Sequence, residues 1–185
     1  ENPDFWEAFR KGESSLPERP ETAYDDALPF LGAEARRISR SAGLAPASLT
    51  AAKVYLHQQR EHMAGVRRAL QKPHFRFPIQ LTNAFAALLP HLSEIRKEVQ
   101  NFQIEALVAI ERGDGDGAID ALQQTVALGK VAAKEPCLLG QLVGMACHQI
   151  ALNGTERLLT WRPLSLQQLP KLERLIDDMQ IPGGL

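Results

Sequence analysis

The sequence has only two cysteines in 185 residues, Cys137 and Cys147, and their spacing excludes a disulfide between them. They are ten residues apart in one apolar segment with a helical pattern. At 1.5 Å per residue they would lie about 15 Å apart, beyond the roughly 7 Å between Cα atoms that a disulfide allows. No Cys-x-x-Cys spacing points to zinc or redox chemistry, so we expect both to be buried apolar side chains. Cysteine usage therefore leaves the compartment open.

The sequence also lacks a long hydrophobic run. The longest apolar stretch, residues 137–147, already contains Gln141, and its extension to Leu152 adds His148 and Gln149. A membrane span requires about 20 predominantly apolar residues, so we interpret this stretch as a helix of the protein core. Because the chain begins with Glu1 rather than Met, we expect that it was processed or excised from a longer protein.

Aromatic residues are few, at 6%, and β-branched residues are sparse, whereas Ala and Leu are abundant. This balance favours helices over sheets. The net charge of -1 selects neither a polyanionic nor a cationic partner. The charge is unevenly distributed, however: the first thirty residues are acidic, residues 31–100 are basic and the remainder is mildly acidic.

Apolar residues recur at helical spacing along most of the chain, which predicts an all-α fold of six to seven helices stacked as antiparallel hairpins. The clearest stripe begins after Pro90 and ends at the turn 113–117, with Asp114 as a cap for the next helix. Its members are Leu92, Ile95, Val99, Phe102, Ala106 and Ile110. Before this stripe, helices are predicted over residues 3–9, 29–42 and 46–72. After the turn, one helix is predicted to bury Ile119, Leu122, Val126 and Ala133, and the next covers residues 138–160. The last predicted helix opens at a Ser165–Gln168 capping box and buries Leu169, Leu172, Leu175 and Ile176.

We expect residues 1–185 to form a single helical domain. The change in charge along the chain also allows two subdomains, residues 1–72 and 83–180, joined by residues 73–82. In the predicted helix over residues 138–160, the small residues Gly140, Gly144 and Ala151 would permit close packing against another helix.

Catalytic and metal-binding motifs do not fit this sequence. His57 and His62 are five residues apart, about 140° around a helix, so they do not form the His-Glu-x-x-His pair of a zinc protease. The segment 114–117 lacks the later ligands of a calcium loop, and Cys147 and His148 point to different helix faces. Glycine-rich phosphate loops and the Gly-x-Ser-x-Gly elbow are missing. We therefore expect no metal, no cofactor and no catalytic residues.

The basic middle of the chain raises the question of nucleic-acid binding. Lys53, Arg60 and Arg67 recur every seven residues, and Phe75 and Phe77 flank a further arginine. Because the overall pI is near 6.6, we interpret the basic residues as a solvated helix face and expect no nucleic-acid partner. We predict that Phe75 or Phe77, held between two prolines, packs into the core and connects the basic N-terminal hairpin to the C-terminal hairpins.

From Phe102 to Leu122 the chain resembles a tetratricopeptide-type helical hairpin. The bulky, small and turn positions of that motif correspond to Phe102, Ala106, Ala109, Gly113-Asp114, Ala118 and Leu122. Pro136 follows six residues later than the repeat places its closing proline. Over residues 63–180 the chain is also similar to a group of uncharacterised bacterial helical proteins, through segments such as Arg76-Phe77-Pro78 and Glu135-Pro136. That resemblance implies an all-helical fold, no known catalytic residues and a location in the cell envelope or periplasm, with an anchor upstream, rather than the cytoplasm.

The leading hypothesis for function is a non-catalytic protein-interaction or scaffold module, because stacked helical hairpins leave a surface that suits peptides or partner helices. A peptide or protein partner is therefore expected, and the oligomeric state is left open. The alternative is a small-ligand-binding protein or enzyme with its site in an interhelical pocket. Its candidate ligand-binding residues are Gln141 and His148, which are seven residues apart and so lie on nearly the same helix face.

Overall fold

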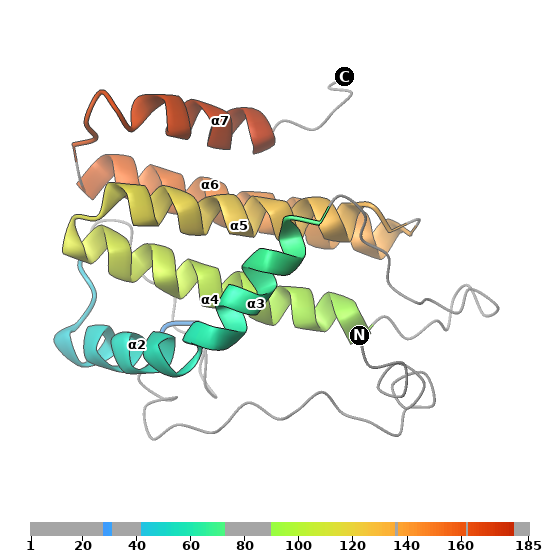
Figure 1. Cartoon of the computed structure of the whole chain (residues 1–185), viewed down its shortest axis with the longest axis horizontal. Coiled ribbons are helices and arrows are strands. Elements are labelled where there is room, and N and C mark those ends of the chain that lie inside the picture. Colours follow the sequence, from blue (N-terminus) through green and yellow to red (C-terminus); the bar gives the residue numbers. More distant parts are fainter. Residues whose placement is uncertain (1–27, 31–41, 73–89, 136, 162, 180–185) are drawn as a thin grey trace.

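The computed structural model describes residues 28–30, 42–72, 90–135, 137–161 and 163–179, and these residues form helices and connecting turns without a strand (Figure 1). This confirms the predicted all-α class. In chain order the six helices of the described part are α2 (Pro46–Gln58), α3 (Arg60–Leu70), α4 (Pro90–Arg112), α5 (Gly115–Ala133), α6 (Leu138–Trp161) and α7 (Leu169–Met179).

The centre of the fold is a bundle of three long helices. α5 packs along both α4 and α6, and α4 also contacts α6 (Figure 1). All six residues of the predicted stripe on α4 are buried, from Leu92 to Ile110. The 3.6-residue period therefore identified the inward face of α4 correctly.

The turn between α4 and α5 forms as the sequence predicts. Gly113 has a φ of 76°, which a residue without a Cβ adopts freely, and Asp114 is the N-cap of α5. The Asp114 carboxylate accepts a hydrogen bond from the backbone N–H of Gly117 at 2.9 Å. On α5, Ile119, Leu122 and Val126 are buried as predicted, but Ala132 takes the buried position expected for Ala133, which is half-buried.

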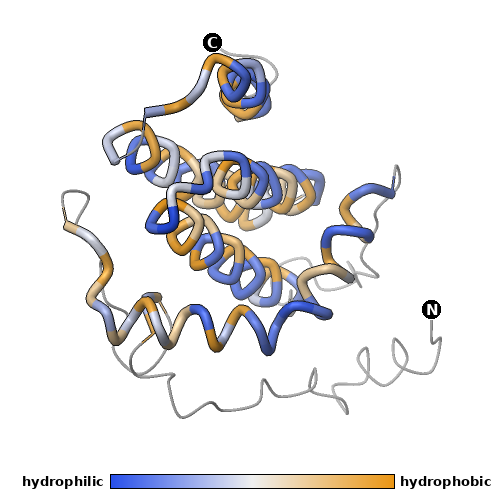
Figure 2. The backbone as a smooth tube through the Cα atoms, turned by 60° about the vertical axis from the view of Figure 1, so that its left-hand side comes forward, coloured by the Kyte–Doolittle hydropathy of each residue, from blue (hydrophilic) through white to orange (hydrophobic). Residues whose placement is uncertain are grey.

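α2 lies beside α4, and α3 rises diagonally from the end of α2 toward α5 (Figures 1 and 2). The prediction of one helix over residues 46–72 was wrong, because the helix is broken at Gln59, whose φ of -83° and ψ of 0° separate α2 from α3. After the break, α3 still contacts α4 through His62 and Arg67, and it also reaches α5. Tyr55 of α2 packs with residues of α4, whereas Met63 of α3 joins a cluster with Leu128 of α5.

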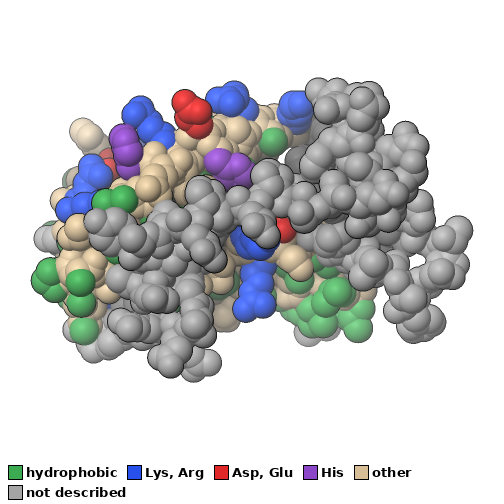
Figure 3. Space-filling view, turned by 90° about the horizontal axis from the view of Figure 1, so that it is seen from below, with side chains coloured by type: hydrophobic (Ala, Val, Ile, Leu, Met, Phe, Trp, Pro, Cys, Tyr) green, Lys and Arg blue, Asp and Glu red, His purple; other side chains and the backbone are tan. Residues whose placement is uncertain are grey.

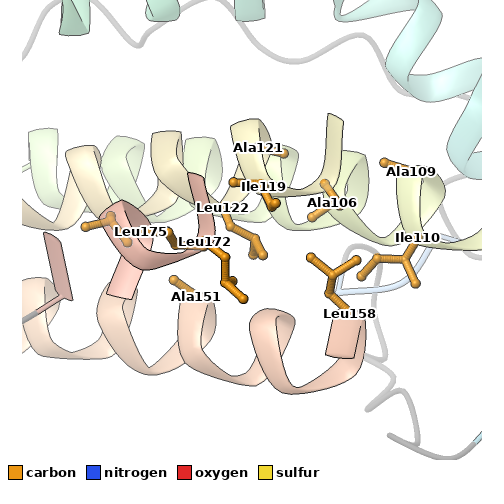
Figure 4. Packing of buried hydrophobic residues seen from close by; sticks show 12 residues of the cluster. Ala106, Ala109, Ile110, Ile119, Ala121, Leu122, Ala151, Leu158, Leu172 and Leu175 are labelled. Atoms are coloured by element: carbon orange, nitrogen blue, oxygen red, sulfur yellow. The ribbon is translucent and has the colours of Figure 1, made fainter. Parts of the chain in front are cut away.

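α7 lies on the outside of the bundle and packs against α5. The predicted capping box is present in part: the backbone N–H of Ser165 donates to Oε1 of Gln168 at 3.0 Å. Leu172 and Leu175 lie with Leu122 and Ala151 between α5, α6 and α7 (Figure 4). The expectation that Leu169 and Ile176 are also buried was wrong, since they are 43% and 44% exposed on a helix with one packed side.

Several predictions lie outside the described residues. These are the short helix over residues 3–9, nearly all of the helix over 29–42, the joining segment 73–82, and the core packing of Phe75 or Phe77. Of the two cysteines, Cys147 is buried as expected, whereas Cys137 is half-buried, and both are free thiols.

Candidate interaction surface

The inward face of α6 is built from small residues that bring its backbone close to α5. A Cβ atom added to Gly140 would lie 2.6 Å from the backbone oxygen of Ala132, and one added to Gly144 would lie 2.9 Å from that of Gly129. Such distances leave no room for a side chain. The prediction that Gly140, Gly144 and Ala151 permit close packing is confirmed, because all three are buried.

The outward face of α6 carries the large apolar residues. Leu138, Leu142, Met145, Leu152 and Leu159 are between 43% and 76% exposed, and Leu139 beside them is 51% exposed. The prediction that this segment is a core helix was therefore wrong for this face. Close contact with α5 requires small residues, so the leucines that make the sequence apolar lie on the opposite side.

These exposed residues follow a heptad pattern. Leu138, Met145, Leu152 and Leu159 recur every seven residues, and Leu142, Gln149 and Glu156 occupy the positions four residues after the first three of them. An apolar seam of this spacing is the feature by which one helix packs against another in a coiled coil. We call these seven residues the α6 seam.

The α6 seam is almost uncharged. The only acidic or basic residues of α6 are Glu156 and Arg157, and Arg157 is buried, so Glu156 is the single formal charge of the helix on this side. Monomeric proteins rarely expose a large contiguous apolar surface, and those that do generally use it for binding. The seam is therefore the strongest candidate for a functional surface in the described part of the chain.

The structure places the two predicted ligand-binding residues at the edge of α6 that faces α5. The side chain of Gln141 is exposed and its Nε2 donates a hydrogen bond to the backbone oxygen of Ala133. His148 is half-buried against Gly129, since a Cβ added to Gly129 would lie 3.0 Å from the His148 Cδ2 atom. Both side chains thus lie along α5, one near its C-terminus and the other about a turn earlier.

The surroundings of His148 favour a neutral imidazole. Burial lowers its pKa below the usual 6.5, the positive charge of Lys130 lowers it further, and a hydrogen bond with the Val126 backbone acts in the opposite direction. The buried Nε2 atom has no hydrogen-bond partner among the described residues. Lys130 in turn pairs with Asp178 of α7, so residues of α5, α6 and α7 meet here. A neutral imidazole beside an ammonium group can accept a hydrogen bond from a ligand.

A cluster of polar side chains, which the sequence analysis did not predict, connects the ends of α4 and α6. The guanidinium of Arg157 donates to Oε1 of Glu111 at 3.1 Å and to the backbone oxygen of Ala42 at 2.9 Å, and it lies 5.0 Å from the centre of the Trp161 ring. Arg157 is 4% exposed. Each of these groups is fixed by its contacts with the others, so we assign the cluster to stability.

A third polar group lies between α2, α3 and α4. The Tyr55 hydroxyl donates to Asn101 Oδ1 at 2.7 Å, Asn101 Nδ2 donates to Glu98 at 3.0 Å, and His62 contacts the same carboxylate at 2.8 Å. Tyr55 and Asn101 are fully buried, whereas His62 is exposed. No local sequence signal marks the contacts of Tyr55 with Asn101 and of His62 with Glu98, because these partners lie on different helices and are 46 and 36 residues apart.

The predicted basic face of α2 and α3 is not one surface. Lys53 and Arg60 are exposed, but Arg67 is half-buried, pairs with Glu105 and lies 5.0 Å from the centre of the Phe102 ring. Where the molecule is seen from below and is not covered by grey atoms, the Lys and Arg side chains form separate groups, with histidine and acidic side chains between some of them (Figure 3). Arg67, one of the three basic residues spaced seven apart, therefore takes part in the packing between helices.

Among the residues that the structure describes, no three histidine, cysteine or carboxylate side chains are grouped so that they could hold a metal ion. None of the described helices is both long and apolar enough to cross a membrane. Comparisons with protein-family models, with curated proteins and with solved structures find no match to this chain.

Proposed function

We propose that this protein is a non-catalytic protein-interaction or scaffold module and that the α6 seam is its docking surface. The observation that carries the proposal is the exposure, at heptad spacing, of Leu138, Leu142, Met145, Leu152 and Leu159 on a helix whose opposite face is packed. Exposed leucines of this number are costly to solubility, and burial against a partner would remove about 25 cal/mol of unfavourable hydration for each Å² covered.

The chemistry of the α6 seam defines the kind of partner. A helix that presents apolar residues at intervals of three and four would place its side chains between those of the seam. Because Glu156 is the only charge along α6 on this side, the partner's contact stripe is expected to be mostly uncharged as well. The sequence resemblance of residues 102–122 to a tetratricopeptide-type hairpin supports such a role, since helical-repeat proteins of that kind present extended binding surfaces.

A photo-cross-linking amino acid placed at Met145 tests the proposal. Met145 lies in the α6 seam and is 49% exposed, and Gln58, exposed at the end of α2, is the control position. Recombinant protein labelled at either position is irradiated in native extract, and products are resolved by mass spectrometry. We expect a discrete cross-linked polypeptide from position 145 and none from 58. Equal cross-linking from both positions, or none from 145 with the label intact, would contradict the proposal.

A second candidate function is a small-ligand-binding protein or enzyme with its site at His148. The specific observation in its favour is the buried Nε2 atom of His148, which has no hydrogen-bond partner among the described residues and lies near Lys130. A thermal-shift screen of anionic metabolites on the wild type and on His148→Gln tests it. A compound that stabilises the wild type and His57→Gln, the exposed control, but not His148→Gln would support this alternative.

A further inference from the structure

We propose that α7 is a releasable strap, which forms a helix only while it is docked on α5 and α6 and leaves them as one unit before the rest of the bundle unfolds. This proposal goes beyond the interaction module, because it concerns α7 and holds whether or not the α6 seam binds a partner. Three features carry it: the small apolar contact of α7, the ion pairs at its two ends, and the order of charges along its sequence.

The apolar contact of α7 with the bundle is small. Leu172 and Leu175 are its buried residues, at 7% and 0% exposed, and Met179 at its end is half-buried. Every other residue of this helix is exposed, whereas ten residues of α5 are buried. A segment with few buried contacts opens at a lower free energy than the core on which it lies. We therefore expect α7 to open separately from α5.

An exposed ion pair holds each end of α7 to α5. Lys171, in the first turn of α7, contacts Asp116 in the first turn of α5, and Gln168 donates a hydrogen bond to the same carboxylate at 2.8 Å. Asp178, in the last turn of α7, contacts Lys130 near the end of α5. The four charged side chains are between 45% and 54% exposed, so salt screens both pairs. Together the pairs set α7 parallel to α5 (Figure 1).

The order of charges along α7 suits α5 and not α7 itself. An isolated helix is stabilised by acidic residues in its first turn and basic residues in its last turn, and α7 has neither. It has instead Lys171 near its N-terminus and Asp178 near its C-terminus, each unfavourable toward its own helix dipole. Its 11 residues are also fewer than the roughly 12–15 below which isolated helices are marginal in water. The contacts that stabilise this helix are therefore available only when it is docked.

Release of α7 would uncover an apolar surface between α5 and α6. The two leucines of α7, Leu172 and Leu175, lie there with Leu122 of α5 and Ala151 of α6 (Figure 4). The α5 charges described above, a carboxylate and an ammonium group, stand at opposite ends of this surface. The surface therefore accepts a helix with two leucines three residues apart, a lysine before them and an aspartate after them, which is the pattern of α7.

Hydrogen exchange of the whole chain, followed by mass spectrometry, gives the first test. We expect the amides of residues 172–179 to exchange together, at least about tenfold faster than those of α5. Raising NaCl from about 50 mM to about 500 mM should speed exchange in α7 about twofold to tenfold and leave α5 unchanged, because the exposed pairs are screened. Equal protection of the two helices would overturn the proposal, as would exchange in α7 that salt does not change.

Asp178→Lys separates docking from the intrinsic stability of the helix. The substitution gives α7 a basic last turn, which favours an isolated helix, but it places a second ammonium group beside Lys130. We expect exchange in α7 to become about threefold to tenfold faster, and Lys130→Asp in the same chain to restore most of the protection. Lys53→Asp, the same change at an exposed position of α2, should restore nothing. Slower exchange in Asp178→Lys would overturn the proposal, as would equal effects of the two second substitutions.

A synthetic peptide of residues 163–179 tests the surface that α7 covers. The peptide alone should be mostly non-helical by circular dichroism. It should bind the whole chain with Leu172→Ser and Leu175→Ser, in which the strap is released, at least about tenfold more tightly than the wild type, in which α7 occupies the surface. A peptide with the same two substitutions is the control and should bind neither chain.

Two outcomes of the peptide experiment would contradict the strap. One is a peptide that is already helical alone, and the other is a peptide that does not distinguish the released chain from the wild type. Circular dichroism of the released chain checks that its remaining helices are folded. If they are not, hydrogen exchange in the wild type decides the proposal, because it requires no substitution.

Discussion

Gly144 of α6 lies directly against Gly129 of α5. A Cβ atom added to Gly144 would lie 2.9 Å from the backbone oxygen of Gly129, and one added to Gly129 would lie 3.1 Å from that of Gly144. The two helices therefore meet backbone to backbone at this crossing. This contact fixes which side of α6 faces inward, and so determines that its leucines face outward.

Gly144→Ala should destabilise the protein although alanine favours a helix by about 1 kcal/mol over glycine. The added methyl group also meets the Ala133 Cβ at 2.9 Å, so α5 and α6 must separate. We expect a net loss of about 1–3 kcal/mol in the free energy of unfolding, measured by urea denaturation.

Gly65→Ala is the matched control for that substitution. Gly65 lies within α3, and the nearest group to an added Cβ is the flexible end of Arg68 at 3.9 Å. With no contact to break, alanine should stabilise by about 0.5–1 kcal/mol. Equal effects at positions 65 and 144 would show that the α5–α6 contact is not close.

Arg157→Met should be strongly destabilising, because it removes the charge that balances Glu111 in a nearly enclosed site. Loss of one member of such a pair costs about 3 kcal/mol or more, since the other charge keeps its burial penalty. Arg174→Met, on the exposed side of α7, should change stability by less than about 0.5 kcal/mol. Combining Arg157→Met with Glu111→Gln should recover part of the loss, and additive losses would argue against a direct coupling.

The sequence predicted those parts of the fold in which local pattern and tertiary contact agree. On α4, apolar residues recur at intervals of three and four from Leu92 to Ile110, and this local pattern identifies one buried face. A second face, with Ile104 and Val108, is buried against α2 and was not part of the predicted stripe. The turn before α5 has a glycine for a positive φ and Asp114 for a cap, and both requirements are local. For these features, the residues within about ten positions along the chain are enough to predict the structure.

The features that the sequence did not predict depend on distant residues. The break at Gln59 involves no proline or glycine, and it accompanies packing of α2 on α4 and of α3 toward α5. The Arg157–Glu111 pair joins residues 46 apart. α6 carries apolar residues on every side, so its period cannot show which face is exposed. Gly140 and Gly144 could have identified the inward face of α6, because small residues lie where two helices are in closest contact. The leucines would then have been predicted on the exposed face.

Cys147 should resist thiol reagents that modify Cys137. Burial raises the pKa of the Cys147 thiol to about 11, so very little thiolate forms at pH 8, and its side chain is 3% exposed. We expect iodoacetamide at pH 8 to modify Cys137 alone in the folded protein and both cysteines in urea. Peptide mass mapping measures each site separately, and rapid modification of Cys147 under native conditions would show that α6 opens from α5.

His148 should make the protein less stable as the pH falls below neutrality. Burial, with the neighbouring charge of Lys130, lowers its pKa in the folded chain relative to the usual value of 6.5, so the unfolded chain binds the proton more tightly. The stability that this difference contributes is present above pH 6.5 and is lost as the pH falls through 6.5 toward the folded pKa. His148→Gln should therefore flatten the dependence of unfolding free energy on pH between 7 and 5.

His91, whose pKa is also lowered by burial, should keep part of that slope in the variant. His57→Gln, exposed at the end of α2, is the control substitution of the same kind. Urea titrations of the three proteins at several pH values provide the measurement, and identical slopes for wild type and His148→Gln would show that His148 is solvated rather than held against α5.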